Sequence, residues 1–219
     1  MSTLFIVSTP IGNLADITLR ALDTLKNADL IACEDTRTTQ KLLSHYQIIK
    51  PTISYHQHSK IGKVDQIIDA LKAGKNVALV TDAGTPGISD PGNKLVSAAI
   101  EANIKIEPIP GPSALTSALS ISGLPTDRFL FLGFLPHKKG RQTLIKEIKD
   151  SQYAIVLYES VHRIQKLLTE LSDLDREIVV CRELTKKFET IYRGLPKAVL
   201  TQLTGDKVKG EFVVIINKM

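Results

Sequence analysis

Several residue types that mark a specialised class of protein are scarce in this chain. Its 219 residues include no tryptophan, and aromatic residues make up only 5%. Because stacking of single-stranded bases needs aromatic side chains, any nucleic-acid recognition would depend on shape and charge. No apolar run approaches the roughly 20 residues that cross a bilayer, and the N-terminus lacks the basic and apolar regions of a signal peptide. We therefore expect no membrane association.

Cysteine is almost absent, and familiar nucleotide motifs are missing. Cys33 and Cys181 stand alone, without C-x-x-C or Cys/His spacing. This usage predicts two core thiols in a reducing cytoplasm and no structural metal. There is no G-x-G-x-x-G, and Gly92 is followed by Asn93-Lys94 where a P-loop needs Lys and then Ser or Thr. Nucleoside triphosphate chemistry is thereby disfavoured.

Positive charge is concentrated in the C-terminal part of the chain. The formal net charge is +5; residues 1–126 carry 11 Lys/Arg and 11 Asp/Glu, whereas residues 127–219 carry 17 and 12. A basic half is expected if an anionic polymer such as RNA lies across it. The alternative is a solvated surface that happens to be basic.

The stretch from Val77 to Gly92 joins a short apolar run to a loop rich in glycine and proline. Val77–Val80 has the pattern of a buried parallel strand. The loop that follows cannot continue as a strand or helix. In open α/β sheets, ligands bind at the carboxyl ends of the strands, so this loop is a candidate cofactor site. A purely structural connection is the alternative.

Apolar runs and helical periodicities predict an α/β protein of two domains. Residues 1–115 alternate strands and helices and predict a parallel N-terminal domain. Residues 116–126 are expected to be a hinge. Residues 127–219 have more closely spaced strands and predict a mixed-sheet α/β domain. The expected strands are residues 4–7, 30–33, 52–55, 77–80, 104–109, 129–134, 154–158, 178–181, 190–193 and 212–216.

Five stretches, taken in order, resemble the tetrapyrrole methylase superfamily. They are Thr9-Pro-Ile-Gly-Asn13, Glu34-Asp-Thr-Arg37, Asp82-Ala-Gly-Thr-Pro-Gly-Ile-Ser-Asp-Pro-Gly92, Pro110-Gly-Pro-Ser-Ala114 and Tyr158-Glu-Ser-Val-His-Arg163. Within the superfamily they are most similar to a branch of 2'-O-methyltransferases that act on a cytidine of 16S rRNA in the 30S subunit.

The resemblance implies a two-domain methylase fold, S-adenosylmethionine as cofactor and a homodimer. It also implies cofactor contacts at positions that match the family's motifs. These are Pro10, Gly12, Asp82, Ala83, Gly84, Thr85, Ile88, Ser113, Ala114, Glu159 and Leu184. Methyl transfer from a sulfonium needs alignment and loss of a hydroxyl proton, and it needs no metal.

The Glu34-Asp35-Thr36-Arg37 cluster is the candidate for proton removal or substrate alignment. A carboxylate pair beside an arginine can hold a perturbed pKa, so we predict catalytic roles for Glu34, Asp35 and Arg37. The alternative is that Asp35 or Thr36 caps the helix that follows. His56 and His58 share one strand face without a third ligand, so ordinary histidines are favoured over metal ligands.

Basic residues of the second half are candidates for phosphate contacts. They are Lys138, Lys139, Arg141, Lys186 and Lys187. A solvated basic face is the alternative for this set. Two rival functions also stay open: a methylase of small tetrapyrrole-type molecules, and a non-catalytic module that binds RNA or the ribosome.

Overall fold

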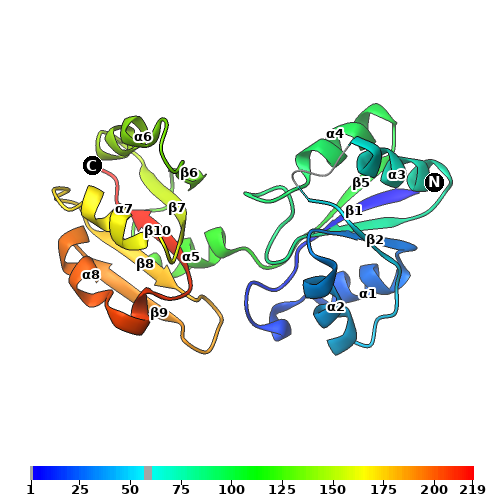
Figure 1. Ribbon diagram of the computed structural model, residues 1–219, viewed down its shortest axis with the longest axis horizontal. Helices are drawn as coiled ribbons and strands as arrows, with labels where there is room; N and C mark the ends of the chain where they lie inside the picture. Colours follow the sequence, from blue (N-terminus) through cyan, green and yellow to red (C-terminus); the bar gives the residue numbers. More distant parts are fainter. Residues whose placement is uncertain (1, 57–60) are drawn as a thin grey trace. The chain divides into compact units, whose positions relative to one another are not determined.

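The structure is a computed structural model that describes residues 2–56 and 61–219. The chain divides into two compact units, Met1–Ser113 and Ala114–Met219. Figure 1 shows each unit as a sheet with helices packed against it.

The first unit is built on a parallel five-stranded sheet in the order β3-β2-β4-β1-β5. Its strands are β1 (Thr3–Val7), β2 (Leu30–Cys33), β3 (Thr52–Ser54), β4 (Val77–Val80) and β5 (Lys105–Ile109). β4 lies at the centre, and all four of its residues are buried. Complete burial is expected of a parallel strand covered on both faces. The predicted parallel sheet is confirmed.

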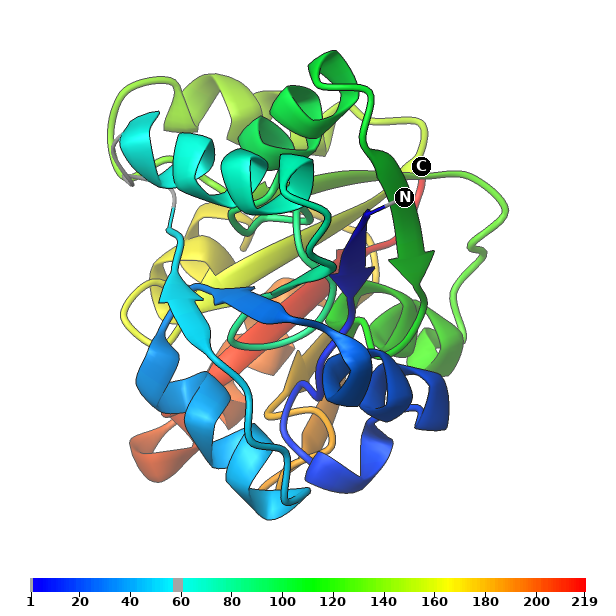
Figure 2. The ribbon, with the colours of Figure 1, turned by 90° about the vertical axis from the view of Figure 1, so that its right-hand side faces the viewer.

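Helices cover both faces of this sheet. They are α1 (Leu19–Asn27), α2 (Thr36–His45), α3 (Ile61–Lys72) and α4 (Asn93–Glu101), with a short 3-10 turn, η1 (Leu14–Asp16). Figures 1 and 2 show α1 and α2 on one face and α3 and α4 on the other. Successive strand residues point to opposite faces of the sheet. Ala78 and Val80 therefore pack on the side of α1 and α2, and Val77 and Leu79 pack on the side of α3 and α4.

The second unit contains a mixed sheet in the order β6-β7-β10-β8-β9. Its strands are β6 (Phe129–Phe134), β7 (Ala154–Ser160), β8 (Ile178–Arg182), β9 (Thr190–Gly194) and β10 (Glu211–Ile216). Only the β6–β7 pair is parallel, and the other three pairs are antiparallel. The predicted mixed sheet is therefore confirmed.

Four helices and a 3-10 turn accompany the second sheet. They are α5 (Ala114–Ser122), α6 (Arg141–Lys149), α7 (Ile164–Glu170), α8 (Pro196–Gln202) and η2 (Gly205–Val208). One apolar core joins α6, α7 and α8 to the sheet through residues such as Ile148, Leu167 and Val199. The sheet is thus covered on this face by all three helices.

The segment expected to be a hinge is largely helical. α5 occupies Ala114–Ser122 and packs against β10, so the boundary between the units falls at Ser113. Its buried residues are Ala118, Leu119 and Ser122. The helix contains no charged residue, so it has no strongly polar face from which an amphipathic pattern could be recognised.

Two expectations from composition concern the thiols and the membrane. Cys33 and Cys181 are both buried and free. Burial raises the pKa of Cys181 to about 11, so its thiol is protonated at neutral pH. Within residues 2–56 and 61–219, no helix is long and apolar enough to cross a bilayer.

Candidate active site

Three loops are hydrogen-bonded to one another at the carboxyl edge of the first sheet. They follow β1, β4 and β5, which are adjacent and parallel, so their ends meet. Thr9 N donates to Gly84 O (2.9 Å), and Gly84 N donates to Thr9 O (3.0 Å). The Thr85 hydroxyl is 2.9 Å from the Ser8 hydroxyl and donates to Pro112 O (3.3 Å). We call Ser8, Thr9, Gly84, Thr85 and Pro112 the loop junction.

Glycine makes this junction possible at two positions. Gly84 has a φ of +86°, a left-handed conformation that side chains disfavour. At Gly111, a Cβ would lie 3.0 Å from the Ser8 Cβ, which is too close without movement of one loop. Glycine is therefore favoured at position 84 by the backbone conformation and at position 111 by the close approach to the first loop.

The cofactor residues predicted in the first unit lie in or beside the loop junction. Gly84 and Pro10 are buried and Thr85 is half-buried, whereas Gly12, Asp82 and Ala83 are exposed. Ile88 is 43% exposed. Ser113 follows Pro112 directly and is partly buried, and Ala114, also partly buried, is the first residue of the second unit. The geometry thus brings most of this set together.

Carboxylates gather at the same edge, around the buried hydroxyl of Thr81. That hydroxyl donates to Glu34 Oε2 (3.1 Å), which joins the ends of β2 and β4. Asp82 Oδ1 accepts the backbone N–H of Asp35 (3.1 Å). Burial raises the pKa of Asp82 above its usual range, and the bond from Asp35 opposes the rise. The loops that follow β2 and β4 are therefore joined by hydrogen bonds of the Glu34 and Asp82 side chains.

Asp90 is a member of this acidic group that the sequence did not indicate. Burial and the nearby charge of Glu34 raise the pKa of Asp90 to about 6, while a hydrogen bond with Thr81 opposes the rise. The Thr81 hydroxyl has one proton and can donate to only one carboxylate at a time. A proton on Asp90 relieves this shortage. The Asp-Pro-Gly sequence looks like ordinary turn chemistry, and only the fold places Asp90 near Glu34.

Asp35 and Arg37 pair with each other at the start of helix α2, where Asp35 has a structural role. Asp35 is the N-cap of α2 and accepts the backbone N–H of Arg37 (2.8 Å). The Arg37 side chain pairs with the same carboxylate at 2.7 Å, and these bonds lower the pKa of Asp35 to about 2. A carboxylate with so low a pKa is a weak base. The capping alternative therefore describes what Asp35 does in this structure.

Substitutions at Asp35 separate capping from catalysis. We expect Asp35→Ala to lower the urea midpoint of unfolding and Asp35→Asn to leave it near wild type, because asparagine is an equally good cap. In the methyl transfer that the resemblance implies, Asp35→Asn should lower the rate by less than about tenfold, short of the 10²–10⁴-fold effect of losing a general base. A loss of hundredfold or more in a stably folded Asp35→Asn protein would restore the catalytic role.

In the second unit, Glu159 and Leu184 are both buried. Glu159 is 1% exposed, and its carboxylate contacts Arg163 and Arg141 rather than solvent. Leu184 is 8% exposed and lies in the loop between β8 and β9. A contact of Glu159 with a bound cofactor would therefore have to come from its backbone.

The five predicted phosphate-binding residues divide into two groups. Lys138, Lys139 and Lys187 are exposed. Arg141 is 2% exposed and donates to both carboxylate oxygens of Glu170, with a shortest distance of 2.7 Å. Its placement argues against the predicted phosphate contact, because exposure of the guanidinium would leave Glu170 without this partner.

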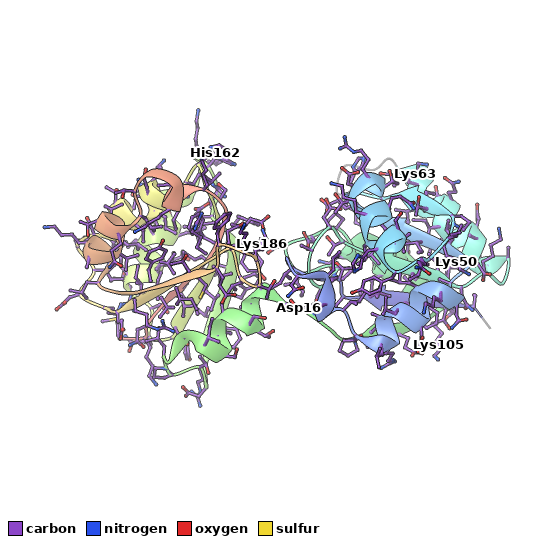
Figure 3. The ribbon with its side chains drawn as sticks, turned by 90° about the horizontal axis from the view of Figure 1, so that it is seen from below. Asp16, Lys50, Lys63, Lys105, His162 and Lys186 are labelled. Carbon is purple, nitrogen blue, oxygen red and sulfur yellow. The ribbon has the colours of Figure 1, made fainter. Side chains whose placement is uncertain are left out.

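Lys186 (labelled in Figure 3) is also already paired. Its ammonium lies 2.9 Å from Glu183 Oε1 and 2.6 Å from Glu211 Oε2. These carboxylates outweigh the effect of burial and raise the pKa of Lys186. A phosphate would have to compete with two carboxylates, so Lys186 is a weaker candidate than Lys187.

The histidines give no indication of a metal site. His58 lies outside the described residues. Among residues 2–56 and 61–219, no group of three or more His, Cys, Asp or Glu side chains is placed to hold a metal ion. His162, which Figure 3 labels on the second unit, is exposed and follows β7 in a turn.

Comparison with known proteins gives a consistent assignment. A family model described as Tetrapyrrole (Corrin/Porphyrin) Methylases matches residues 3–199. The chain is 50% identical to "Ribosomal RNA small subunit methyltransferase I" of Synechocystis sp., over 99% of this chain and 79% of that protein. It is 43% identical to the protein of the same name from Thermotoga maritima, over 99% of both chains.

Solved structures share the fold at much lower identity. Diphthine synthase superposes with a TM-score of 0.78 at 16% identity, covering 99% of this chain and 90% of that one. Uroporphyrin-III-C-methyltransferase from Thermus thermophilus gives a TM-score of 0.66 at 17% identity, covering 100% and 95%. Because the family model spans both units and the relatives align over nearly the whole chain, this protein belongs to the tetrapyrrole methylase family.

Proposed function

We propose that this chain is an S-adenosylmethionine-dependent methyltransferase of small-subunit ribosomal RNA, and that its acceptor is the 2'-hydroxyl of a cytidine in 16S rRNA. The observation that carries the proposal is the identity of 43% and 50%, over 99% of this chain, to proteins named for that RNA. The 30S subunit is the proposed partner. We also propose that the protein is a homodimer in the cytoplasm. Sedimentation would measure its oligomeric state.

The loop junction suits this cofactor. S-adenosylmethionine has a positive sulfonium and ammonium, and Asp82 and its neighbours make this edge of the sheet acidic. The exposed side chain of Ile88 offers an apolar contact for the methionine chain or the adenine. We assign the methionine part to Asp82, Ala83, Gly84, Thr85 and Ile88. Pro10, Gly12, Ser113, Ala114, Leu184 and the Glu159 backbone stay as further predicted contacts.

Asp82 should contribute to cofactor affinity through its charge. We expect Asp82→Ala and Asp82→Asn both to weaken binding of S-adenosylhomocysteine by about tenfold, as measured by calorimetry, because removal of a charged partner costs about 1–2 kcal/mol. Asparagine keeps the oxygen that accepts the Asp35 N–H. If Asp82→Asn binds like wild type, Asp82 holds the loop and does not act through its charge.

The cofactor supplies an activated methyl group, and the protein must align the acceptor and remove its proton. Asp82, Ala83, Gly84, Thr85 and Ile88 would hold the cofactor, whose sulfonium would give up its methyl group to the ribose oxygen, and a base of the protein would accept the hydroxyl proton. Asp90 is our choice for the proton acceptor, since a carboxylate with a pKa of about 6 is a stronger base than an ordinary aspartate. Glu34 holds the Thr81 hydroxyl, and we assign Arg37 to substrate alignment.

Exposed lysines of the second unit are proposed to bind the RNA backbone. Lys138, Lys139 and Lys187 are the members of the predicted set that the structure leaves exposed. Phosphate contacts of this kind position a protein without reading bases.

The deciding experiment measures transfer of label from S-adenosylmethionine to RNA. We expect the wild-type protein to label 16S rRNA in 30S subunits that lack the modification, and nuclease digestion to place the label on a cytidine ribose. The control is the same subunits already methylated. Labelling of a tetrapyrrole instead of rRNA would favour the small-molecule methylase, and no binding of S-adenosylhomocysteine would favour the non-catalytic module.

A further inference from the structure

We propose that Glu159 is a positioning residue for RNA binding. It is the centre of a buried ion network that fixes the backbone of the basic loop carrying Lys138 and Lys139. The inference rests on the proposed RNA-methylating function. We call Arg141, Glu159, Arg163 and Glu170 the anchor network, and residues 135–140 the basic loop.

The carboxylate of Glu159 is enclosed at the end of β7. Its side chain is 0% exposed. Oε1 lies 2.8 Å from Arg163 Nε and accepts the backbone N–H of Ser160 (2.8 Å). Oε2 lies 3.9 Å from Arg141 Nη1 and has no hydrogen-bond partner among the described residues. A buried charge of this kind persists only where cations compensate it, and here two arginines do so.

Both arginines also bind the backbone of the basic loop. Arg163 Nη1 donates to Leu135 O (2.7 Å), and Arg141 Nη1 donates to Pro136 O (3.3 Å). The Arg163 guanidinium also lies over the ring of Phe134, 5.9 Å from its centre. Two consecutive carbonyls are thus held by guanidiniums that converge on one carboxylate. The loop connects β6 to α6 beside β7 (Figure 1).

The far end of the loop is fixed by the same network. Arg141 N donates to Lys138 O (3.2 Å), and the Arg141 side chain is bound to Glu170 of α7. Lys138 and Lys139 lie between these fixed points with exposed side chains. The two lysines are therefore exposed side chains on a backbone segment that is hydrogen-bonded at both ends. Fixing the backbone before binding reduces the ordering that the RNA complex requires.

This role differs from the cofactor contact predicted for Glu159. A cofactor contact through the Glu159 side chain predicts loss of affinity for S-adenosylhomocysteine on substitution, whereas a contact through its backbone predicts no such loss. A positioning role predicts loss of affinity for RNA, and only while the lysines are present. A purely structural role predicts lower stability with neither pattern.

The test is Glu159→Gln in the wild-type chain and in a Lys138→Ala, Lys139→Ala background. Affinities are measured for unmethylated 30S subunits over a range of salt and for S-adenosylhomocysteine. We expect Glu159→Gln to weaken 30S binding by about fivefold to tenfold and to make its salt dependence shallower, because fewer phosphates are contacted at once. Cofactor affinity should stay within about twofold, and in the double-alanine background Glu159→Gln should add less than about twofold.

A second variant, Arg163→Lys, tests the same network if Glu159→Gln does not fold. Arg163→Lys keeps a cation beside Glu159, but a single ammonium cannot reproduce the guanidinium's contacts with both the carboxylate and Leu135 O. It should show the same RNA defect, dependent on Lys138 and Lys139.

Three results would overturn the proposal. They are unchanged 30S affinity in both folded variants, an equal loss in the double-alanine background, and a loss confined to cofactor affinity. Failure of the wild-type protein to bind or methylate 30S subunits would instead remove the proposed function itself.

Discussion

Asp90→Asn should lower the rate of methyl transfer by about 10²–10⁴-fold, the range associated with loss of a general base. The raised pKa of about 6 means that the wild-type carboxylate is ionised at pH 7.5 and can accept the hydroxyl proton. Below pH 6 the carboxylate becomes protonated, so the wild-type rate should fall about tenfold per pH unit. Single-turnover labelling of 30S subunits at saturating cofactor measures both effects.

Two controls make the Asp90 result interpretable. Affinity for S-adenosylhomocysteine should stay within about twofold, and Asp65→Asn, a change at an exposed position of α3, should leave the rate unchanged. If Asp90→Asn keeps its rate and pH dependence, the base is elsewhere, and Glu34→Gln becomes the next variant.

The same substitution has an effect on stability that does not depend on catalysis. Because the folded-state pKa of Asp90 lies above that of an unfolded aspartate, folding favours the protonated form. The stabilisation that protonated Asp90 gives the wild-type protein is fully present below pH 4 and is lost as the pH rises through about 6. Asp90→Asn should therefore raise the melting temperature at pH 8 relative to wild type, and the difference should disappear near pH 4. If the difference in melting temperature between Asp90→Asn and wild type is the same at pH 4 and pH 8, Asp90 does not have the raised pKa assigned to it.

Replacing Lys138 and Lys139 together with alanine should weaken 30S binding by about tenfold at physiological salt and lower the salt slope by roughly 1.5, since each phosphate contact contributes about 0.7–0.9. Fluorescence anisotropy with a labelled 16S fragment, or filter binding of subunits, measures both quantities. Cofactor affinity should not change.

The matched control removes the same charge elsewhere. Lys63→Ala with Lys72→Ala changes two exposed lysines on α3 of the first unit. If both pairs weaken binding equally, only net charge matters, and the basic loop has no special place in RNA binding.

Much of the fold could be predicted because the apolar runs that form strands are bounded by polar, glycine or proline residues. The stretch from Val77 to Val80 is continuously apolar, and it is the fully buried central strand. The mixed sheet followed from closely spaced strands in the second half. The helix from Ala114 to Ser122 was harder, since it has no charged face to mark its period.

The candidate site was less predictable, because sequence shows which residues are near in the chain and not which side chains pair. Asp35 was assigned to catalysis with Glu34, with helix capping as the alternative, and the structure shows the capping role together with the Arg37 pair. Arg141 was grouped with the exposed lysines, yet it pairs with Glu170, 29 positions away. Asp90 is far from Glu34 in the chain, and only folding brings their charges together.

The paired backbone bonds between Thr9 and Gly84 restrict how the loop junction can diverge among relatives. An insertion or deletion in either loop would shift one member of the pair out of register and leave two polar groups unbonded. The lengths of these loops should therefore vary together or not at all. More than 70 positions separate the two segments along the chain, yet these bonds make the length of each loop a constraint on the other.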